Sequence, residues 1–270
     1  MYQWLRTKYS QWRWNSKITK LISRNVTSSA TPSSRITLSM CMKNEASNYL
    51  CQMLESCARY IDEAVIIDDA STDNSVDICT EILSRNNIKH KIIENEFSMF
   101  DREFSLREKL WEETVKSNPD WILFLDADEI FEERFAKDIK TLLMSDPSVW
   151  VYRFRLFDMW DSHHFREDVN WNAHFRYTPF LLRYNPNFKY LFSRHKKNQH
   201  CGRMPENVRW LKSANSDLRL KHYGWADKNR RLVKYLRYKK LDPKGVYGNS
   251  EQYDSILDEN VNLVLWREVE

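Results

Sequence analysis

Two carboxylates separated by one residue follow a continuous apolar segment near the middle of the chain. Asp126 and Asp128 come directly after Trp121–Leu125, and an apolar run of this length is typical of a buried strand. Because side chains alternate along an extended backbone, the two carboxylates should point in roughly the same direction. Oxygen ligands of this kind suit Mg²⁺ or Mn²⁺, and such an ion can neutralise a diphosphate. The pair is therefore a candidate metal and diphosphate site.

A second acidic strand end lies upstream. The apolar segment Ala64–Ile67 runs into Asp68 and Asp69, which are followed by Ala70–Asp73. Two strand–acid units of this kind indicate a nucleotide-sugar site. The alternative is that both acid pairs only cap the N-termini of helices, where Asp, Ser and Thr are favoured.

Three motifs appear in the order in which they occur in a known enzyme family. Lys43-Asn44-Glu45, Ile67–Asp73 and Phe124–Glu129 resemble the motifs of bacterial family 2 glycosyltransferases, and the resemblance runs from about Arg35 to about Gly224. It implies a GT-A fold, a nucleotide-sugar donor, a divalent metal and inversion at the anomeric carbon. It also implies a role in cell-surface polysaccharide biosynthesis.

The resemblance implies roles for residues at matching positions. It places Asp69 near the nucleobase, and Asp126 and Asp128 at the diphosphate and metal. Arg107 could reach the phosphates. The predicted donor-binding residues are Lys43, Asn44, Glu45, Asp68, Asp69, Ser71, Arg107, Asp126, Ala127 and Asp128. The implied cofactor is Mn²⁺ or Mg²⁺, and a UDP-sugar is the leading donor.

One histidine is a candidate third metal ligand. His222 lies in Leu218–Trp225, which resembles the strand end that closes the site in this family. In related GT-A enzymes a histidine there can complete the metal shell or touch the diphosphate. The alternative is a structural histidine.

The acceptor side should begin after residue 156. Arg166, Asp168 and Trp171 lie in a polar segment with few helix signals, where a Trp ring could stack on a sugar. The alternative is an ordinary loop with Trp171 in the core.

Direct displacement with inversion needs a carboxylate that removes the acceptor proton. We expect Asp168 in that role, with Asp161 and Glu206 as the other candidates. A glycan or another hydroxyl compound would be the acceptor.

Scarce glycine argues against several classes of nucleotide-binding protein. The chain has only four glycines, and it contains neither GxGxxG nor GxxxxGK[ST], which Rossmann and P-loop proteins need. A sugar-nucleotide nucleotidyltransferase would need a glycine-rich loop that Ser39–Asn44 does not supply. A non-catalytic carbohydrate-binding protein would leave the pair Asp126 and Asp128 unexplained. No nucleic-acid-binding module is recognisable.

Cysteine usage and hydropathy indicate a cytoplasmic protein. The five cysteines include no CxxC pair, so we expect buried, reduced thiols at Cys41, Cys51 and Cys57. No stretch approaches the 18 apolar residues of a membrane span.

The N-terminus is basic and aromatic. Eight of the 42 Lys and Arg residues precede Glu45, the first acidic residue. The rest of the chain therefore contains 34 basic and 38 acidic residues. The arm of residues 1–24 could contact the anionic inner face of a membrane or grip an acidic acceptor. Alternatively, it packs on its own domain or associates with a second subunit. The composition of residues 26–34 is typical of a short linker.

Alternating strand and helix patterns position these residues. Strands are expected at Ile36–Met42, Ala64–Asp68, Lys89–Ile93, Trp121–Leu125 and Val149–Leu156, and helices at Glu45–Tyr60, Ser75–Asn86, Arg102–Ser117 and Phe131–Met144. This alternation predicts an α/β protein whose mostly parallel central sheet has helices on both faces. Ligands of such sheets bind at the carboxyl ends of the strands, where Asp69 and Asp126 lie.

The C-terminal extension should be helical. Asp227–Leu241 is rich in Lys and Arg and carries Leu232, Tyr235, Leu236 and Tyr238 at helix-like spacing. We expect this stripe to pack on the domain with the charges in water. Alternatively, Lys228, Arg230 and Arg231 reach the diphosphate or an acidic acceptor. The predicted units are the arm and linker at 1–34, a catalytic domain at 35–224 and this extension at 225–270.

Overall fold

The computed structural model describes residues 34–192, 202–243, 245 and 248–269. The N-terminal arm, nearly all of the linker and Cys201 lie outside these residues. The membrane contact or self-association expected for residues 1–24 therefore stays a prediction.

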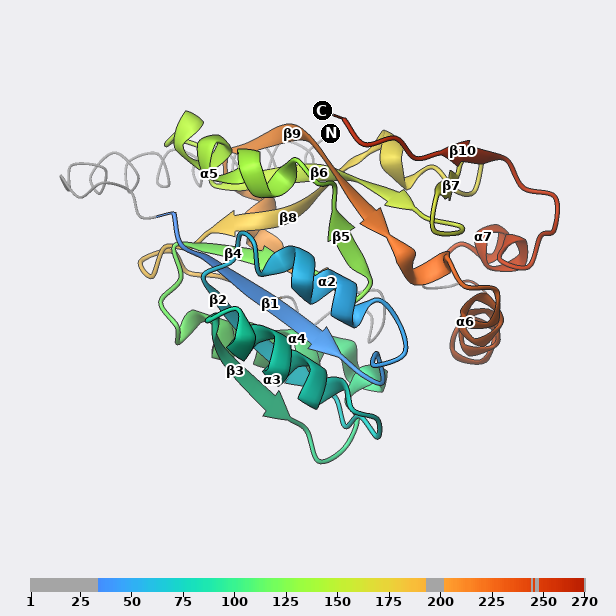
Figure 1. The fold of residues 1–270 in the computed structure, drawn as a ribbon, viewed down its shortest axis with the longest axis horizontal. Coiled ribbons are helices and arrows are strands. Elements are labelled where there is room, and N and C mark those ends of the chain that lie inside the picture. Colours follow the sequence, from blue (N-terminus) through green and yellow to red (C-terminus); the bar gives the residue numbers. More distant parts are fainter. Residues whose placement is uncertain (1–33, 193–201, 244, 246–247, 270) are drawn as a thin grey trace, which may run out of the picture.

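Within the described residues, an eight-stranded sheet forms the centre of the protein, in the order β3-β2-β1-β4-β8-β6-β9-β5 (Figure 1). In this order the strands span Lys89–Glu94, Glu63–Asp68, Ile36–Met42, Trp121–Phe124, Tyr177–Arg183, Val151–Asp158, Ser213–His222 and Glu129–Phe131. Neighbours among the first four are parallel, and β6 is parallel to β9. The pairs β4–β8, β6–β8 and β5–β9 are antiparallel.

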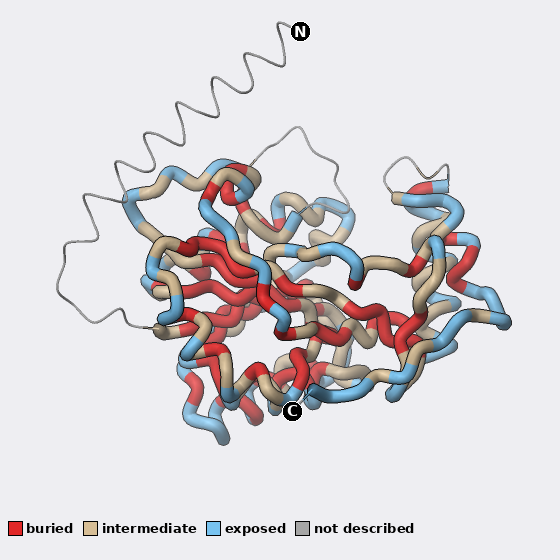
Figure 2. The backbone as a smooth tube through the Cα atoms, turned by 90° about the horizontal axis from the view of Figure 1, so that it is seen from above, coloured by how far each residue is buried: buried red, intermediate tan, exposed pale blue. Residues whose placement is uncertain are grey.

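Helices cover both faces of this sheet. In the described part of the chain the α-helices are α2 (Leu50–Cys57), α3 (Ser75–Arg85), α4 (Glu103–Val115), α5 (Phe135–Ser145), α6 (Lys228–Leu241) and α7 (Ser250–Ser255). Side chains of β1 alternate between faces. Met40 packs in one buried cluster with residues of α2, α3 and α5, whereas Cys41 packs in another with α4. Buried residues therefore follow the central strands (Figure 2). The predicted fold class is confirmed.

Two helices begin about one turn later in the structure than predicted. The helix expected from Glu45 begins at Leu50, because the backbone N–H groups of Glu45 and Ala46 donate to Ser75, the first residue of α3, and to Asp73 of the loop before it. The helix expected from Phe131 begins at Phe135, because Glu129–Phe131 pairs with β9 as β5. The apolar faces of α2 and α3 point inward as expected.

The register of β9 brings distant residues together at the carboxyl end of β4. His222, the last residue of β9, lies opposite Glu129 of β5 and Asp158 of β6. The backbone N–H of Tyr223 donates to the carbonyl oxygen of Asp128 at 2.8 Å. Strand pairing therefore places His222 beside the Asp126–Asp128 turn.

The C-terminal extension packs differently from the expectation. On α6, Tyr235 and Tyr238 pack against a buried cluster that contains Trp225 and Tyr253. Leu232 and Leu236, predicted to pack on the domain, are exposed. A small sheet of β7 (His164–Arg166) and β10 (Leu263–Leu265) completes this end of the protein. Four 3₁₀ turns are also described, η1 (Phe100–Arg102), η2 (Ala173–Phe175), η3 (Glu206–Trp210) and η4 (Tyr223–Trp225).

Candidate functional site

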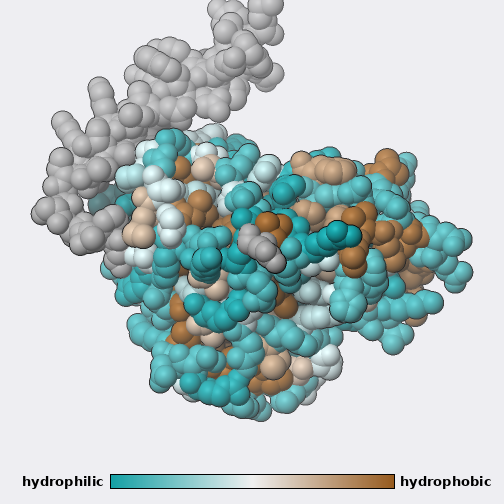
Figure 3. All heavy atoms as spheres, turned by 45° about the horizontal axis from the view of Figure 1, so that its top comes forward, coloured by the Kyte–Doolittle hydropathy of each residue, from teal (hydrophilic) through white to brown (hydrophobic). Residues whose placement is uncertain are grey.

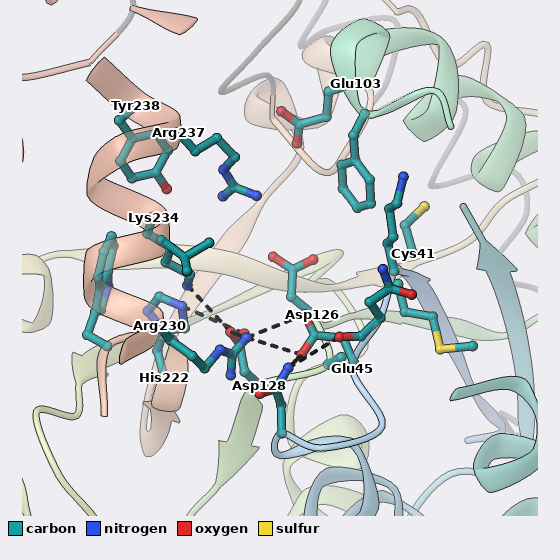
Figure 4. A pocket seen from close by; sticks show the side chains of 18 of the residues that line it. Cys41, Glu45, Glu103, Asp126, Asp128, His222, Arg230, Lys234, Arg237 and Tyr238 are labelled. Carbon is teal, nitrogen blue, oxygen red and sulfur yellow. Dashed lines mark hydrogen bonds and ion pairs between the residues drawn. The ribbon is translucent and has the colours of Figure 1, made fainter. Parts of the chain in front are cut away.

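A cavity of about 760 Å³ opens at the carboxyl ends of β1 and β4 and is walled on one side by α6 (Figure 4). Its charged and polar lining includes Lys43, Asn44, Glu45, Arg107, Asp126, Asp128, Arg203, His222, Arg230, Lys234 and Arg237. Acidic strand ends therefore face a basic helix across one cavity, in the position where ligands of α/β sheets bind.

Asp126 is held by two guanidinium groups. Arg107 Nη2 lies 3.1 Å from Asp126 Oδ1, and Arg203 Nη2 lies 2.7 Å from Oδ2. Burial alone would raise the pKa of Asp126, but Arg203 and Arg107 hold it well below its ordinary value. Arg203 also binds the fully buried Glu129. Asp126 is therefore an ionised anchor for two cations.

Asp128 faces two cationic side chains and a histidine. Its Oδ2 lies 3.6 Å from Arg230 Nη2 and 3.7 Å from Lys234 Nζ, and its Oδ1 lies 3.7 Å from His222 Nε2. Burial would raise the pKa of Asp128, but Lys234 and His222 lower it below the ordinary value. These separations are longer than hydrogen bonds, so the carboxylate is surrounded by positive charge without being tightly bound.

His222 is oriented by a second carboxylate. Its Nδ1 lies 2.7 Å from Asp158 Oδ1. Burial lowers the pKa of His222, but the Asp128 and Asp158 carboxylates outweigh burial and raise it. A histidine that donates Nδ1–H to a carboxylate presents the Nε2 lone pair on its other side, which is the usual arrangement behind a metal-binding histidine.

Gly224 leaves the space between these groups open. A Cβ atom on residue 224 would lie 2.4 Å from both His222 Nε2 and Lys234 Nζ, and 2.9 Å from Asp128 Oδ2. Any side chain here would occupy the volume that the three functional groups face. The glycine is thus required by close approach rather than by backbone conformation.

The donor set partly fits the predicted metal. Among the residues that the structure describes, no group of three or more His, Cys, Asp and Glu side chains is arranged to hold an ion. Asp128 and His222 nevertheless present donor atoms 3.7 Å apart, close enough to share an ion with bonds of about 2.1 Å. Asp126 could become a further ligand of the ion only if Arg107 or Arg203 moved, because each of its carboxylate oxygens already accepts from one of these arginines.

The predicted corner Lys43-Asn44-Glu45 lines the cavity. Asn44 adopts a left-handed backbone conformation with φ 53°, and its Oδ1 accepts from the Thr72 N–H at 2.7 Å. Glu45 Oε2 lies 3.1 Å from Arg230 Nη2. The corner therefore joins the loop before α3 to the basic face of α6.

The acids at the end of β2 do not line the cavity. Asp68 accepts from the Ser71 N–H, and Ser71 Oγ accepts from the Asn44 N–H. The fully buried Asp69 accepts from the N–H groups of Met99 and Phe100 and from two side chains of the same loop. Asp68, Asp69 and Ser71 therefore support the loops around the cavity in this structure.

The predicted acceptor residues lie away from the cavity. Asp168 Oδ2 binds Arg166 Nε at 2.6 Å, and Asp168 Oδ1 accepts from the Trp171 N–H. Arg166 is buried over the rings of Trp160 and Trp171, and Trp171 is only 1% exposed. None of the three predicted residues lines the cavity. They form a structural cluster, because Arg166 packs on the buried Trp171 ring and Asp168 is the counterion of Arg166.

The other two candidate bases lie in different surroundings. Asp161 accepts from the N–H groups of His163 and His164 and does not line a cavity described here. Glu206 lines a second hollow of about 440 Å³. Arg107 and Arg203 line both the hollow and the first cavity, so the two cavities adjoin at these arginines.

Several site residues were not predicted. Asp158, Arg203, Lys234 and Arg237 were not singled out in the sequence, and Arg230 was considered only as one of several basic residues. The spacing 230, 234 and 237 places these three side chains on one helix face, which was a usable signal. Asp158 and Arg203 had no such signal, because strand pairing and tertiary contacts bring them to the site.

Comparison with known proteins supports one family for the N-terminal part. Residues 37–103 match the model of glycosyl transferase family 2. This match includes Lys43–Glu45 and Asp68–Asp73, and it ends before Asp126. No curated protein matches the sequence. Within the described residues, no helix has the length and apolar character needed to cross a bilayer.

Solved structures with a similar chain path are distant in sequence. TarS of S. aureus has 13% identity and a TM-score of 0.49 over 83% of this chain, which covers 42% of the TarS chain. The mannosyltransferase PcManGT of Pyrobaculum calidifontis, in complex with GDP-Man and Mn²⁺, has 12% identity and a TM-score of 0.46 over 94% of this chain and 78% of its own. Glucosyl-3-phosphoglycerate synthase of Mycobacterium tuberculosis, with Mg²⁺ and UDP, has 15% identity and a TM-score of 0.31 over 46% and 43%.

Proposed function

We propose that this protein is a metal-dependent, inverting glycosyltransferase that moves a sugar from a nucleotide-diphosphate donor to a hydroxyl group of a glycan or another acceptor. The observation that carries the proposal is the cavity in which Asp126 and Asp128 face the basic side of α6. The family match over residues 37–103 supports the same reaction class.

The basic side chains suit a diphosphate. Arg230, Lys234 and Arg237 line one wall of the cavity. Arg230 Nη1 is buried and has no hydrogen-bond partner among the described residues, and a buried donor without a partner is costly unless a ligand satisfies it. Fixed cations at this position would stabilise the charge that develops on the leaving nucleotide. We therefore assign donor-phosphate binding to this helix face.

Asp128 and His222 are the proposed ligands of Mn²⁺ or Mg²⁺. When bound, such an ion stabilises negative charge on the leaving diphosphate. Asp158 holds the His222 ring so that Nε2 faces Asp128. Asp126 is proposed chiefly to hold Arg107 and Arg203 at the cavity wall, since its oxygens already bind both.

Glu206 is the proposed base. Inversion by direct displacement needs a carboxylate that takes the proton from the acceptor hydroxyl, on the side opposite the leaving group. Of the three candidates from the sequence, only Glu206 lines a hollow next to the donor cavity. We propose that the acceptor enters through this hollow, where Phe104 and Phe180 supply apolar walls.

A donor panel tests the proposal. The purified full chain is mixed with UDP-, GDP-, CMP- and dTDP-sugars, with and without Mn²⁺, and melting temperature and nucleotide release are measured. A donor present at 100 times its Kd should stabilise the fold by about 2.7 kcal/mol, and UDP-sugars are the first to test. If no donor raises the melting temperature or releases nucleotide, the proposal fails. Full activity in EDTA would show that transfer does not depend on a metal ion.

A further inference from the structure

One face of α6 is exposed and combines apolar with basic side chains. Exposed residues recur along the helix at Lys228, Asn229, Leu232, Val233, Leu236, Arg237, Lys240 and Leu241. Leu232 is 47% exposed, Val233 66% and Leu236 57%. This face of the helix carries no acidic residue. Several large apolar side chains next to one another on a surface commonly mark an interaction site.

The opposite side of α6 is fixed to the protein. Tyr235 and Tyr238 pack into the cluster that contains Trp225 and Tyr253. Arg231 Nη1 donates to the carbonyl oxygens of Trp160 and Trp225 at 2.8 and 2.5 Å. Because these contacts hold the helix by its inner side, a rotation that buried the leucines would break them.

The exposed face of α6 borders the cavity. Val233, Arg237 and Leu241 belong both to this face and to the cavity lining. Figure 3 shows further hydrophobic side chains at the end of the molecule that carries α6, α7 and β10. A partner that covers this face would therefore lie at the edge of the candidate active site.

We propose that the exposed face of α6 binds the surface of an anionic lipid bilayer. A helix lies in a membrane interface when apolar residues enter the acyl boundary and Lys or Arg side chains pair with anionic headgroups. Leu232, Val233 and Leu236 supply the apolar part, while Lys228 and Lys240 supply positive charge near the two ends. Their charge is complementary to anionic lipid. This proposal goes beyond the transferase activity and sets the cavity at the membrane surface, where a lipid-anchored acceptor would meet it.

Vesicle sedimentation tests this proposal without any nucleotide, so its outcome is independent of the proposed activity. The full chain is mixed with phosphatidylcholine vesicles with and without phosphatidylglycerol. We expect binding to the anionic vesicles that weakens as salt rises, because salt screens the charge attraction. The double variant Leu232→Ser/Leu236→Ser should bind at least about tenfold more weakly, since two apolar side chains no longer enter the interface. Lys228→Glu/Lys240→Glu should also weaken binding.

Matched control variants change residues that are at least as exposed and lie elsewhere in the protein. Phe97→Ser/Met144→Ser removes two exposed apolar side chains, and Lys137→Glu reverses an exposed charge on α5. These controls should bind vesicles as the wild type does. Leu232, Leu236, Lys228 and Lys240 do not line the cavity. The melting temperature of each variant serves as the folding control.

Three results would overturn the proposal. The wild type could fail to bind anionic vesicles. The α6 variants could bind vesicles as strongly as the wild type, which would place the membrane contact elsewhere in the chain. Finally, the wild type could form a dimer in solution that the Leu232→Ser/Leu236→Ser variant does not form, while neither protein binds vesicles. This result would show that the exposed face of α6 pairs two copies of the chain.

Discussion

Asp128 is the side chain on which the proposed chemistry converges, because Lys234, Arg230 and His222 all face it. Asp128→Asn keeps the shape and removes the charge. We expect metal-dependent transfer to fall by at least about 10²-fold, since charge stabilisation of a leaving group is worth that much or more. Nucleotide release with and without Mn²⁺ measures the effect. Asp77→Asn, at an exposed acid on α3, is the control, and equal activity of the two variants would contradict the assignment.

Glu206 carries the second prediction for a single residue. Glu206→Gln should lower turnover by roughly 10²–10⁴-fold while nucleotide affinity is kept, because a positioned base acts only in the chemical step. Turnover and nucleotide binding are measured separately. Asp168→Asn should lower stability instead, because Asp168 is a counterion of the buried Arg166. A Glu206→Gln variant with wild-type turnover would move the base to another residue.

The turn from β9 into α6 holds His222, the proposed metal ligand, and the basic helix close to Asp128. Gly224→Ala should disturb this arrangement, because the added methyl group would meet His222 Nε2 and Lys234 Nζ at 2.4 Å. We expect loss of the Mn²⁺-dependent gain in nucleotide affinity, measured by titration calorimetry. Gly202→Ala is the matched control, since the nearest atom to its Cβ would be the Met204 carbonyl oxygen at 3.9 Å. If both variants bind nucleotide alike, the close approach at Gly224 has no functional role.

Strand pairing explains why this turn is well defined. His222 is held between Glu129 of β5 and Asp158 of β6, so its position depends on backbone hydrogen bonds of two neighbours. Arg230 and Lys234 follow within two turns of helix α6. The continuous segment from the end of β9 into α6 therefore carries both the proposed metal ligand and the proposed phosphate-binding groups.

For the whole molecule, thiol reactivity reports the integrity of the core. Burial raises the pKa of Cys41, Cys57 and Cys79 to about 12, whereas Cys51 is exposed, contrary to the expected burial. In a Cys201→Ser background, a thiol reagent at pH 8 should modify Cys51 rapidly. The three buried thiols should react only in denaturant, because the thiolate is the reactive form. Rapid reaction of all four thiols in the native protein would mean that the sheet opens easily.

Much of this architecture was predictable because local patterns agree with the final fold. Fully buried strands such as β1 and β4 read as apolar runs, and α2 and α3 show apolar faces at helical spacing. The acid pair after β4 and the basic spacing on α6 were also visible, since neighbours along the chain determine them. The expected placement of acids at a carboxyl edge of the sheet followed from parallel topology.

Long-range contacts determined the rest. Asp158 and Arg203 join the site through strand register and ion pairing, and neither leaves a local pattern in the sequence. Trp171 and Arg166 looked like sugar-binding residues, because a Trp among charged groups has the same composition in a binding loop and in a buried cluster. The exposure of Leu232 and Leu236 was equally hidden. A helical stripe shows which residues share a face, but only packing against the rest of the chain decides which face is covered.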